Sequence, residues 1–113
     1  MKKTIVKKTQ SISCNFRVAE VEHWEKKGFR LPANKTYVLT IDYPFDRADT
    51  FPINTGKGLE VLDLLPHIYQ AYKQMYQNAK KIGNGYLHGI GDLFVERIKV
   101  NHQTKQITLE VGS

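Results

Sequence analysis

A long run of apolar residues at helical spacing is the feature that most constrains this chain. The run advances by steps of four and three residues through Val61, Leu65, Ile68, Tyr72, Met75, Ala79 and Ile82. This spacing places the side chains on one face and predicts a helix over residues 60–82, about 35 Å long. Lys80 and Lys81 fall in its last turn, and Gly83 follows where a C-terminal cap is expected.

Pro66 is the residue that disagrees with a regular helix over this whole range. Proline lacks a backbone N–H and clashes with the preceding turn, so it is disfavoured inside a helix. The helix therefore either kinks at Pro66 or begins its regular part near Asp63. Both alternatives keep a long helix in the fold.

Four other segments have the composition and spacing of β-strands. Residues 12–18 alternate apolar and polar side chains, following a stretch over residues 4–10 that can also be extended. Residues 36–43 are rich in β-branched and aromatic side chains. Residues 93–100 and 106–111 flank a polar segment with the length of a hairpin loop, so they are expected to pair.

The remaining segments are interpreted as connections. Residues 18–27 form either a short helical turn that closes at Gly28 or a bent strand. Residues 45–58, with their aspartates, their glycines and Pro52, are expected to form a polar loop. Residues 83–91 are the most glycine-dense stretch and are expected to form an irregular connection.

This order of elements predicts an α+β fold. We expect an antiparallel sheet of about four to five strands, with one long helix packed on one face as a two-layer sandwich. The chain has 113 residues, of which 41% are hydrophobic and 25% charged, which is typical of one soluble globular domain. The predicted domain covers residues 1–113 and begins with a lysine-rich N-terminal segment over residues 1–8.

Several classes of protein are excluded by what the sequence lacks. No stretch approaches the roughly 18 consecutive apolar residues of a membrane span, and the first residues lack the apolar core of a secretion signal, so a cytoplasmic protein is expected. Cys14 is the single cysteine and cannot form an internal disulfide bond. The histidines do not stand at the spacing that places two metal ligands on one helix face, so no metal and no cofactor are predicted. His23, His67 and His102 are interpreted as surface residues.

The positive charge is concentrated at the start of the chain. The sequence contains 17 Lys and Arg against 11 Asp and Glu, a formal net charge of +6. Lys2, Lys3, Lys7 and Lys8 account for most of this excess. A nucleic-acid binder is expected to carry a basic stripe with interleaved aromatic side chains, which this segment lacks. Nucleic-acid binding through the basic N-terminus therefore ranks third among the functions considered.

Two glycine-rich segments suggest phosphate binding but have the wrong surroundings. Residues 55–58, Thr-Gly-Lys-Gly, lack the full spacing of a P-loop and are interpreted as the start of the helix. Residues 83–91 follow a helix, whereas the glycines of a dinucleotide-binding motif lie between a strand and a helix. Neither segment is therefore assigned to a phosphate.

A candidate ligand site lies in the glycine-rich segment that follows the helix. His88 and Asp92 bring an imidazole and a carboxylate into one loop, with Tyr86 nearby. Such a pair can act as a general base, because the carboxylate fixes the imidazole tautomer. The structural alternative is that Asp92 caps a turn and His88 packs on the sheet edge. No catalytic residue is assigned, because no nucleophile motif accompanies the pair.

The helix has a second hydrophobic stripe beside the first. Tyr69, Tyr72 and Tyr76, together with Leu62, make the apolar face wider than one sheet contact requires. Tyrosine is enriched in protein interfaces, so this stripe is a candidate interface with a protein partner. The alternative is that the sheet curves around the helix and buries both stripes.

These observations favour binding over catalysis. We predict a small protein that acts by binding or protein–protein interaction as a homo-oligomer, with the tyrosine-bearing helix or the sheet edge as its contact surface. The alternative is a small-molecule-binding or hydrolytic protein, with a site between the helix and residues 86–92. No membrane partner is predicted.

Overall fold

The structure is a computed structural model and describes residues 8–18, 28–45, 47–81 and 89–112. Residues 19–27 of the predicted turn or bent strand at residues 18–27 lie outside the described residues, as do the predicted cap at Gly83 and most of the lysine-rich segment. In chain order the elements are β1 (Thr9–Arg17), β2 (Arg30–Leu31), β3 (Thr36–Ile41), β4 (Asp49–Asn54), β5 (Leu59–Glu60), a 3-10 turn at Val61–Asp63, α1 (Leu64–Lys81), a second 3-10 turn at Ile90–Asp92, β6 (Phe94–Asn101) and β7 (Gln106–Gly112).

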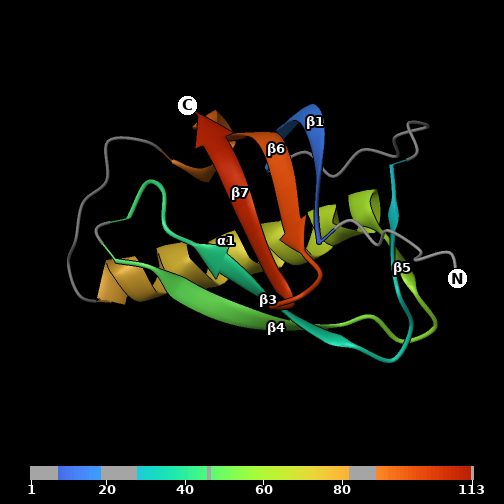
Figure 1. Cartoon of the computed structure of the whole chain (residues 1–113). Helices are drawn as coiled ribbons and strands as arrows, with labels where there is room; N and C mark the ends of the chain where they lie inside the picture. Colours follow the sequence, from blue (N-terminus) through green and yellow to red (C-terminus); the bar gives the residue numbers. More distant parts are fainter. Residues whose placement is uncertain (1–7, 19–27, 46, 82–88, 113) are drawn as a thin grey trace, which may run out of the picture.

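Two layers make up the fold, one a sheet and the other a helix. Five strands form the main sheet in the order β1-β6-β7-β3-β4, and α1 lies across one face of it (Figure 1). β2 and β5 form a separate two-stranded ribbon beside the start of the helix. The predicted α+β class and the strands around residues 12–18, 36–43, 93–100 and 106–111 are confirmed.

The sheet is mixed, whereas the sequence predicted an antiparallel one, and the difference is a single parallel pair. β3 pairs antiparallel with β4 but parallel with β7, where Val38 is opposite Gln106 and Leu39 is opposite Ile107. The cause is the route of the chain, because α1 carries it away from the β4 edge before the β6–β7 hairpin returns to the middle of the sheet. A crossover of this kind permits parallel pairing, which a direct hairpin does not.

The predicted polar loop over residues 45–58 is partly wrong, because it contains the strand β4. Pro52 made this segment look irregular, since proline cannot donate to a strand ladder. In the structure Pro52 is opposite Val38 of β3. The N–H of Val38 points away from β4 and donates to the carbonyl of Lys105, which precedes β7 (2.8 Å). The nitrogen of Pro52 therefore faces the free edge of the sheet, where no pairing hydrogen bond is lost.

Pro66 lies in the first turn of α1, which begins at Leu64. Of the two alternatives from the sequence, a regular start near Asp63 is confirmed, with a 3-10 turn at Val61–Asp63 before it. The first N–H groups of a helix have no partner within the helix, so proline is tolerated there. This start differs from the start at residue 60 that periodicity alone predicted.

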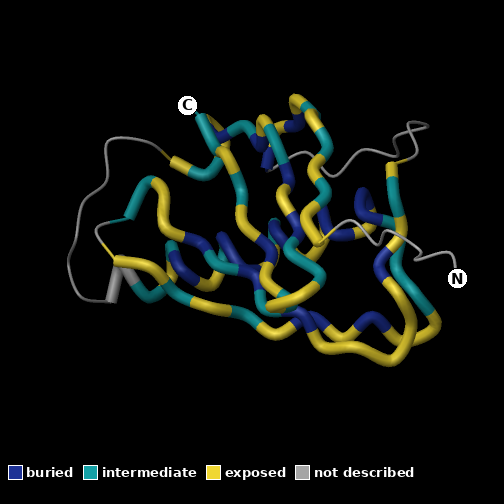
Figure 2. The backbone as a smooth tube through the Cα atoms, viewed as in Figure 1, coloured by how far each residue is buried: buried dark blue, intermediate teal, exposed yellow. Residues whose placement is uncertain are grey.

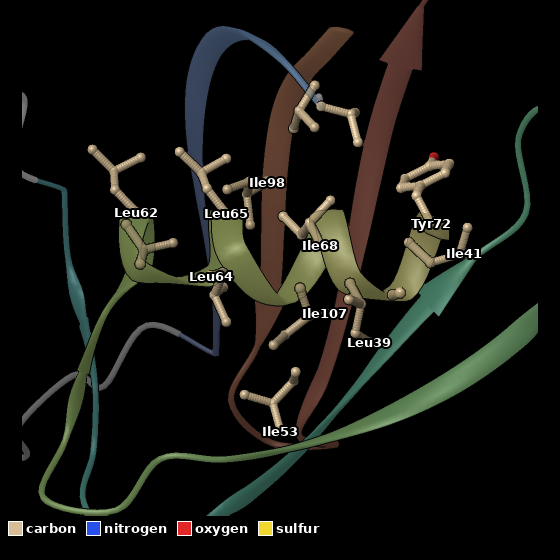
Figure 3. Packing of buried hydrophobic residues seen from close by; sticks show 14 of the residues in the cluster. Leu39, Ile41, Ile53, Leu62, Leu64, Leu65, Ile68, Tyr72, Ile98 and Ile107 are labelled. Carbon is tan, nitrogen blue, oxygen red and sulfur yellow. The ribbon is translucent and has the colours of Figure 1, made fainter. Parts of the chain in front are cut away.

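The hydrophobic core lies between α1 and the inner face of the sheet. Figure 2 shows the buried residues along α1 and the strands that face it, and Figure 3 shows their packing. Tyr37, Leu39 and Ile41 point inward from β3 with at most 1% exposure, as period-two alternation requires. They pack in one cluster with Ile68 and Tyr72 of the helix.

Candidate functional site

The loop proposed as a ligand site is only partly described. Tyr86 and His88 lie outside the described residues. Asp92 is exposed, and its carboxylate accepts a hydrogen bond from the N–H of Gly89 (3.3 Å) while its own N–H donates to the Gly89 carbonyl (3.0 Å). These contacts close a local turn. The proposed ligand site at residues 86–92 stays a prediction.

The tyrosine stripe is covered unevenly. Leu62 and Tyr72 are buried, at 7% and 1% exposure, so their side chains leave little surface for a partner (Figure 3). Tyr69 and Tyr76 are half-buried and pack against the core cluster. The stripe therefore lies partly in the core, and its role as an interface stays a prediction.

The segment that follows β3 covers the C-terminal half of the stripe. The hydroxyl of Tyr72 donates to the Tyr43 carbonyl (2.8 Å), and the ring of Phe45 packs edge-on against Tyr76, with 4.9 Å between ring centroids. Burial raises the pKa of Tyr72, and the Asp42 carboxylate raises it further. The hydroxyl therefore stays protonated and acts as a donor that attaches this segment to the helix.

A groove runs between α1 and the edge strand β4. Its volume is about 700 Å³. Figure 1 shows β4 extending alongside the helix, so the groove has one helical wall and one strand wall. It is lined by Phe51, Pro52, Ile53, His67, Gln70, Ala71, Lys73, Gln74, Gln77 and Asn78.

The helical wall of this groove is rich in amide side chains. Gln70, Gln74 and Gln77 are exposed and repeat at steps of four and three residues, with Asn78 beside them. Within the described part of the chain, none of these amides has a side-chain hydrogen bond. Each amide has both donor and acceptor capacity, so the wall offers unused hydrogen-bonding groups.

The strand wall of the groove is mainly apolar. Phe51 is half-buried, Ile53 is buried, and Pro52 is exposed at the free edge of the sheet. Because Pro52 removes the central outward N–H of β4, this edge is a poor template for pairing with another strand. Hydrogen bonds to a molecule in the groove would come mainly from the helix.

Sequence reasoning missed this groove for two reasons. The strand wall was interpreted as a loop, and the amides on the polar side of the helix were not considered. A usable signal was nevertheless present. Charged residues are common on the polar side of a surface helix, whereas here four amides, Gln70, Gln74, Gln77 and Asn78, lie among the lysines.

A second polar cluster surrounds His102, which the sequence placed at the surface. The structure shows it half-buried, with Nε2 donating to the Oε1 atom of Gln10 (2.7 Å) and Nδ1 accepting from the hydroxyl of Tyr37 (2.7 Å). The rings of Phe29 and Tyr37 contact the imidazole edge-on, at centroid distances of 6.0 Å and 5.8 Å. His102 thereby joins the β6–β7 turn to β1 and β3.

Burial lowers the pKa of His102, and the nearby Lys105 ammonium lowers it further. The neutral tautomer with its proton on Nε2 gives each ring nitrogen a hydrogen-bond partner. Burial also raises the pKa of Tyr37. The sequence carried no signal for this cluster, because Gln10, Tyr37 and His102 are far apart in the chain.

The glycine-rich segment at residues 55–58 forms a turn between β4 and β5, rather than the start of the helix that the sequence predicted. Gly56 and Gly58 have positive φ angles of 54° and 107°, which explains the glycines. The Thr55 hydroxyl accepts from the Lys35 N–H (3.0 Å) and donates to the Lys35 carbonyl (3.1 Å). The Thr55 hydroxyl therefore stabilises this turn through the backbone of Lys35.

The described residues contain no group of three or more His, Cys, Asp or Glu side chains placed to hold a metal ion. Among the helices in the same residues, none has the length and apolar character needed to cross a membrane.

No protein-family model, no curated protein and no solved structure matches this chain.

Proposed function

We propose that this protein acts by binding an extended segment of another polypeptide in the groove between α1 and β4. The observation that carries the proposal is the row of amide side chains along an open groove with an apolar opposite wall. Amides donate and accept hydrogen bonds, as peptide groups do, so the helical wall complements an extended backbone. Phe51 and Pro52 offer apolar contact to its side chains.

The dimensions of the groove agree with such an occupant. From His67 to Asn78 the helix rises about 16 Å at 1.5 Å per residue. An extended chain advances about 3.3 Å per residue, so the groove accommodates roughly five residues. A short linear segment of a partner is therefore a better fit than a folded surface.

The chemistry of the lining favours binding over catalysis. Amide side chains do not exchange protons near neutral pH, and the ionisable side chains among the lining residues are His67 and Lys73. No Ser, Thr or Cys nucleophile is among the lining residues. The groove is equipped to hold a chain rather than to cleave one.

A display library of random peptides of about ten residues tests this function. The folded protein should enrich peptides, and the variant Gln74→Trp should not, because an indole at this exposed position fills the groove. Thr108→Trp provides the matched control, since Thr108 is exposed on β7 and is absent from the groove lining. Equal enrichment by wild type and Gln74→Trp would rule out the groove as the binding site.

Self-association is the second candidate, and it retains the homo-oligomer predicted from the sequence. Tyr43 favours it, because this side chain is 37% exposed and follows β3 where the segment covers Tyr72. Light scattering at low and high salt distinguishes the candidates. A salt-independent dimer that Tyr43→Ser converts to a monomer would support self-association, and a wild-type monomer would exclude it.

A further inference from the structure

We propose that the groove selects acidic segments, with a carboxylate of the bound peptide lying against Lys73. This inference rests on the proposed function and specifies the class of partner. It follows from the charges along α1 and from the surroundings of the Lys73 ammonium.

The helix that forms one wall contains no acidic residue. Between Leu64 and Lys81 the sequence has three lysines, Lys73, Lys80 and Lys81, and no Asp or Glu. No acidic side chain is among the groove-lining residues either. The charged side chain in the groove lining is therefore that of Lys73, and concave surfaces with one sign of charge attract the opposite sign.

Lys73 is the lysine that lines the groove. Its Nζ lies 4.9 Å from the centroid of the Tyr69 ring, in cation–π contact. Within the described residues it has no carboxylate partner. In contrast, Lys99 and Arg97 on the sheet both pair with Glu110, at 3.0 Å and 3.2 Å.

The contact with Tyr69 positions the Lys73 ammonium without neutralising it. A half-buried lysine stem that packs on an aromatic ring has less conformational freedom to lose when it binds a carboxylate. Charge-assisted hydrogen bonds to carboxylates are stronger than those between neutral groups. A partner carboxylate at this position therefore adds selectivity to the neutral contacts of the amides.

Other occupants agree less well with these observations. A second copy of this chain carries a net charge of +6 and is repelled by a basic groove. A nucleic acid requires repeated cations along its backbone and exposed aromatic faces for its bases. The described groove offers one lysine and a half-buried Phe51.

Two matched peptide pools test the inference. Both contain fluorescent peptides of about ten residues with the same apolar positions. The acidic pool carries Asp and Glu at alternate positions, and the amide pool carries Asn and Gln there. Fluorescence anisotropy measures the binding of each pool to the wild type and to Lys73→Gln, Lys73→Glu and Gln74→Trp. Lys57→Glu is the charge control, because Lys57 is exposed in the β4–β5 turn, away from the groove.

We expect the acidic pool to bind the wild type roughly three- to tenfold more tightly than the amide pool. Lys73→Gln should remove most of this preference, Lys73→Glu should reverse it, and Lys57→Glu should leave it nearly unchanged. The preference should shrink as salt is added, because salt screens exposed charges. Binding of the amide pool should respond little to either change at Lys73.

The outcomes separate this inference from the proposed function. If both pools bind equally and Gln74→Trp blocks both, the groove binds peptides without selecting acids, and only the inference is overturned. If neither pool binds, or if Gln74→Trp leaves binding unchanged, the proposed function is overturned together with the inference. A preference for the acidic pool that survives Lys73→Glu would overturn the inference but not the proposed function.

Discussion

The His102 cluster and the α1–β4 groove both contain polar side chains with amides, but they differ in what those side chains contact. In the cluster both nitrogens of His102 have partners within the chain, namely Gln10 and Tyr37. In the groove the amides of Gln70 and Gln74 have none among the described residues. Satisfied polar groups stabilise the fold, whereas exposed unsatisfied ones are available to a ligand.

The largest expected effect is on the cluster. His102→Ala removes both hydrogen bonds and the ring contacts, and it leaves the Tyr37 hydroxyl and the Gln10 amide without their partner. The free energy of unfolding should fall by about 2 kcal/mol, measured by urea denaturation. Gln103→Ala in the same turn is exposed and should change it by less than about 0.5 kcal/mol. Equal effects of the two changes would show that the hydrogen bonds of His102 contribute no measurable stability.

Tyr37→Phe isolates one bond of the cluster. It deletes the hydroxyl that donates to Nδ1 of His102 and keeps the buried ring. The expected loss is about 1 kcal/mol in the same urea assay, smaller than that for His102→Ala. A double-mutant cycle of Tyr37→Phe with His102→Ala should then show coupling, because the two residues contact one another. Additive losses would indicate that the bond contributes nothing.

The pH dependence of stability follows from the lowered pKa of His102. At pH values below the ordinary pKa of 6.5, His102 is protonated in the unfolded chain, whereas in the folded protein it stays neutral down to a lower pH. Stability should therefore decline as the pH falls below 6.5, until the folded-state pKa is reached. Urea denaturation at several pH values measures this, and His102→Gln should weaken the dependence. An unchanged slope in that variant would assign the dependence to other groups.

The smallest expected effect is on the groove. The free energy of unfolding of the double variant Gln70→Ala with Gln74→Ala should lie within about 0.5 kcal/mol of the wild-type value. It should be equal or slightly higher, because alanine is the better helix former. Peptide binding should nevertheless weaken. A marked loss of stability would show that these amides support the fold, as the polar side chains of the His102 cluster do.

The parts of the fold that follow from local pattern were predictable from the sequence. The 3.6-residue period gave the helix, and the two-residue period gave strands such as β1, with Phe16 inward and Asn15 outward. β4 was missed, because Pro52 is tolerated only at a sheet edge and a sequence does not show which strand is the edge. The parallel β3–β7 pair was missed for a similar reason, since local pattern carries no information about crossovers.

The candidate sites depend on contacts between distant residues, so the sequence predicted them poorly. His102 was assigned to the surface because its position in a hairpin loop is visible, whereas its neighbours Gln10 and Tyr37 are brought to it only by folding. The groove needed both α1 and β4 to be placed. Asp92 was the predicted site residue with local partners, and the alternative weighed for it, capping a turn, agrees with its contacts.

The strand order has a consequence for how the chain is made. β6 and β7 lie in the middle of the sheet, between β1 on one side and β3 with β4 on the other. They are also the last of these elements to leave the ribosome. Until then β1 has no neighbour with which to pair, and the apolar face of α1 is only partly covered. The sheet therefore stays incomplete until β6 and β7 emerge, and exposed apolar surface of this kind is what chaperones generally protect.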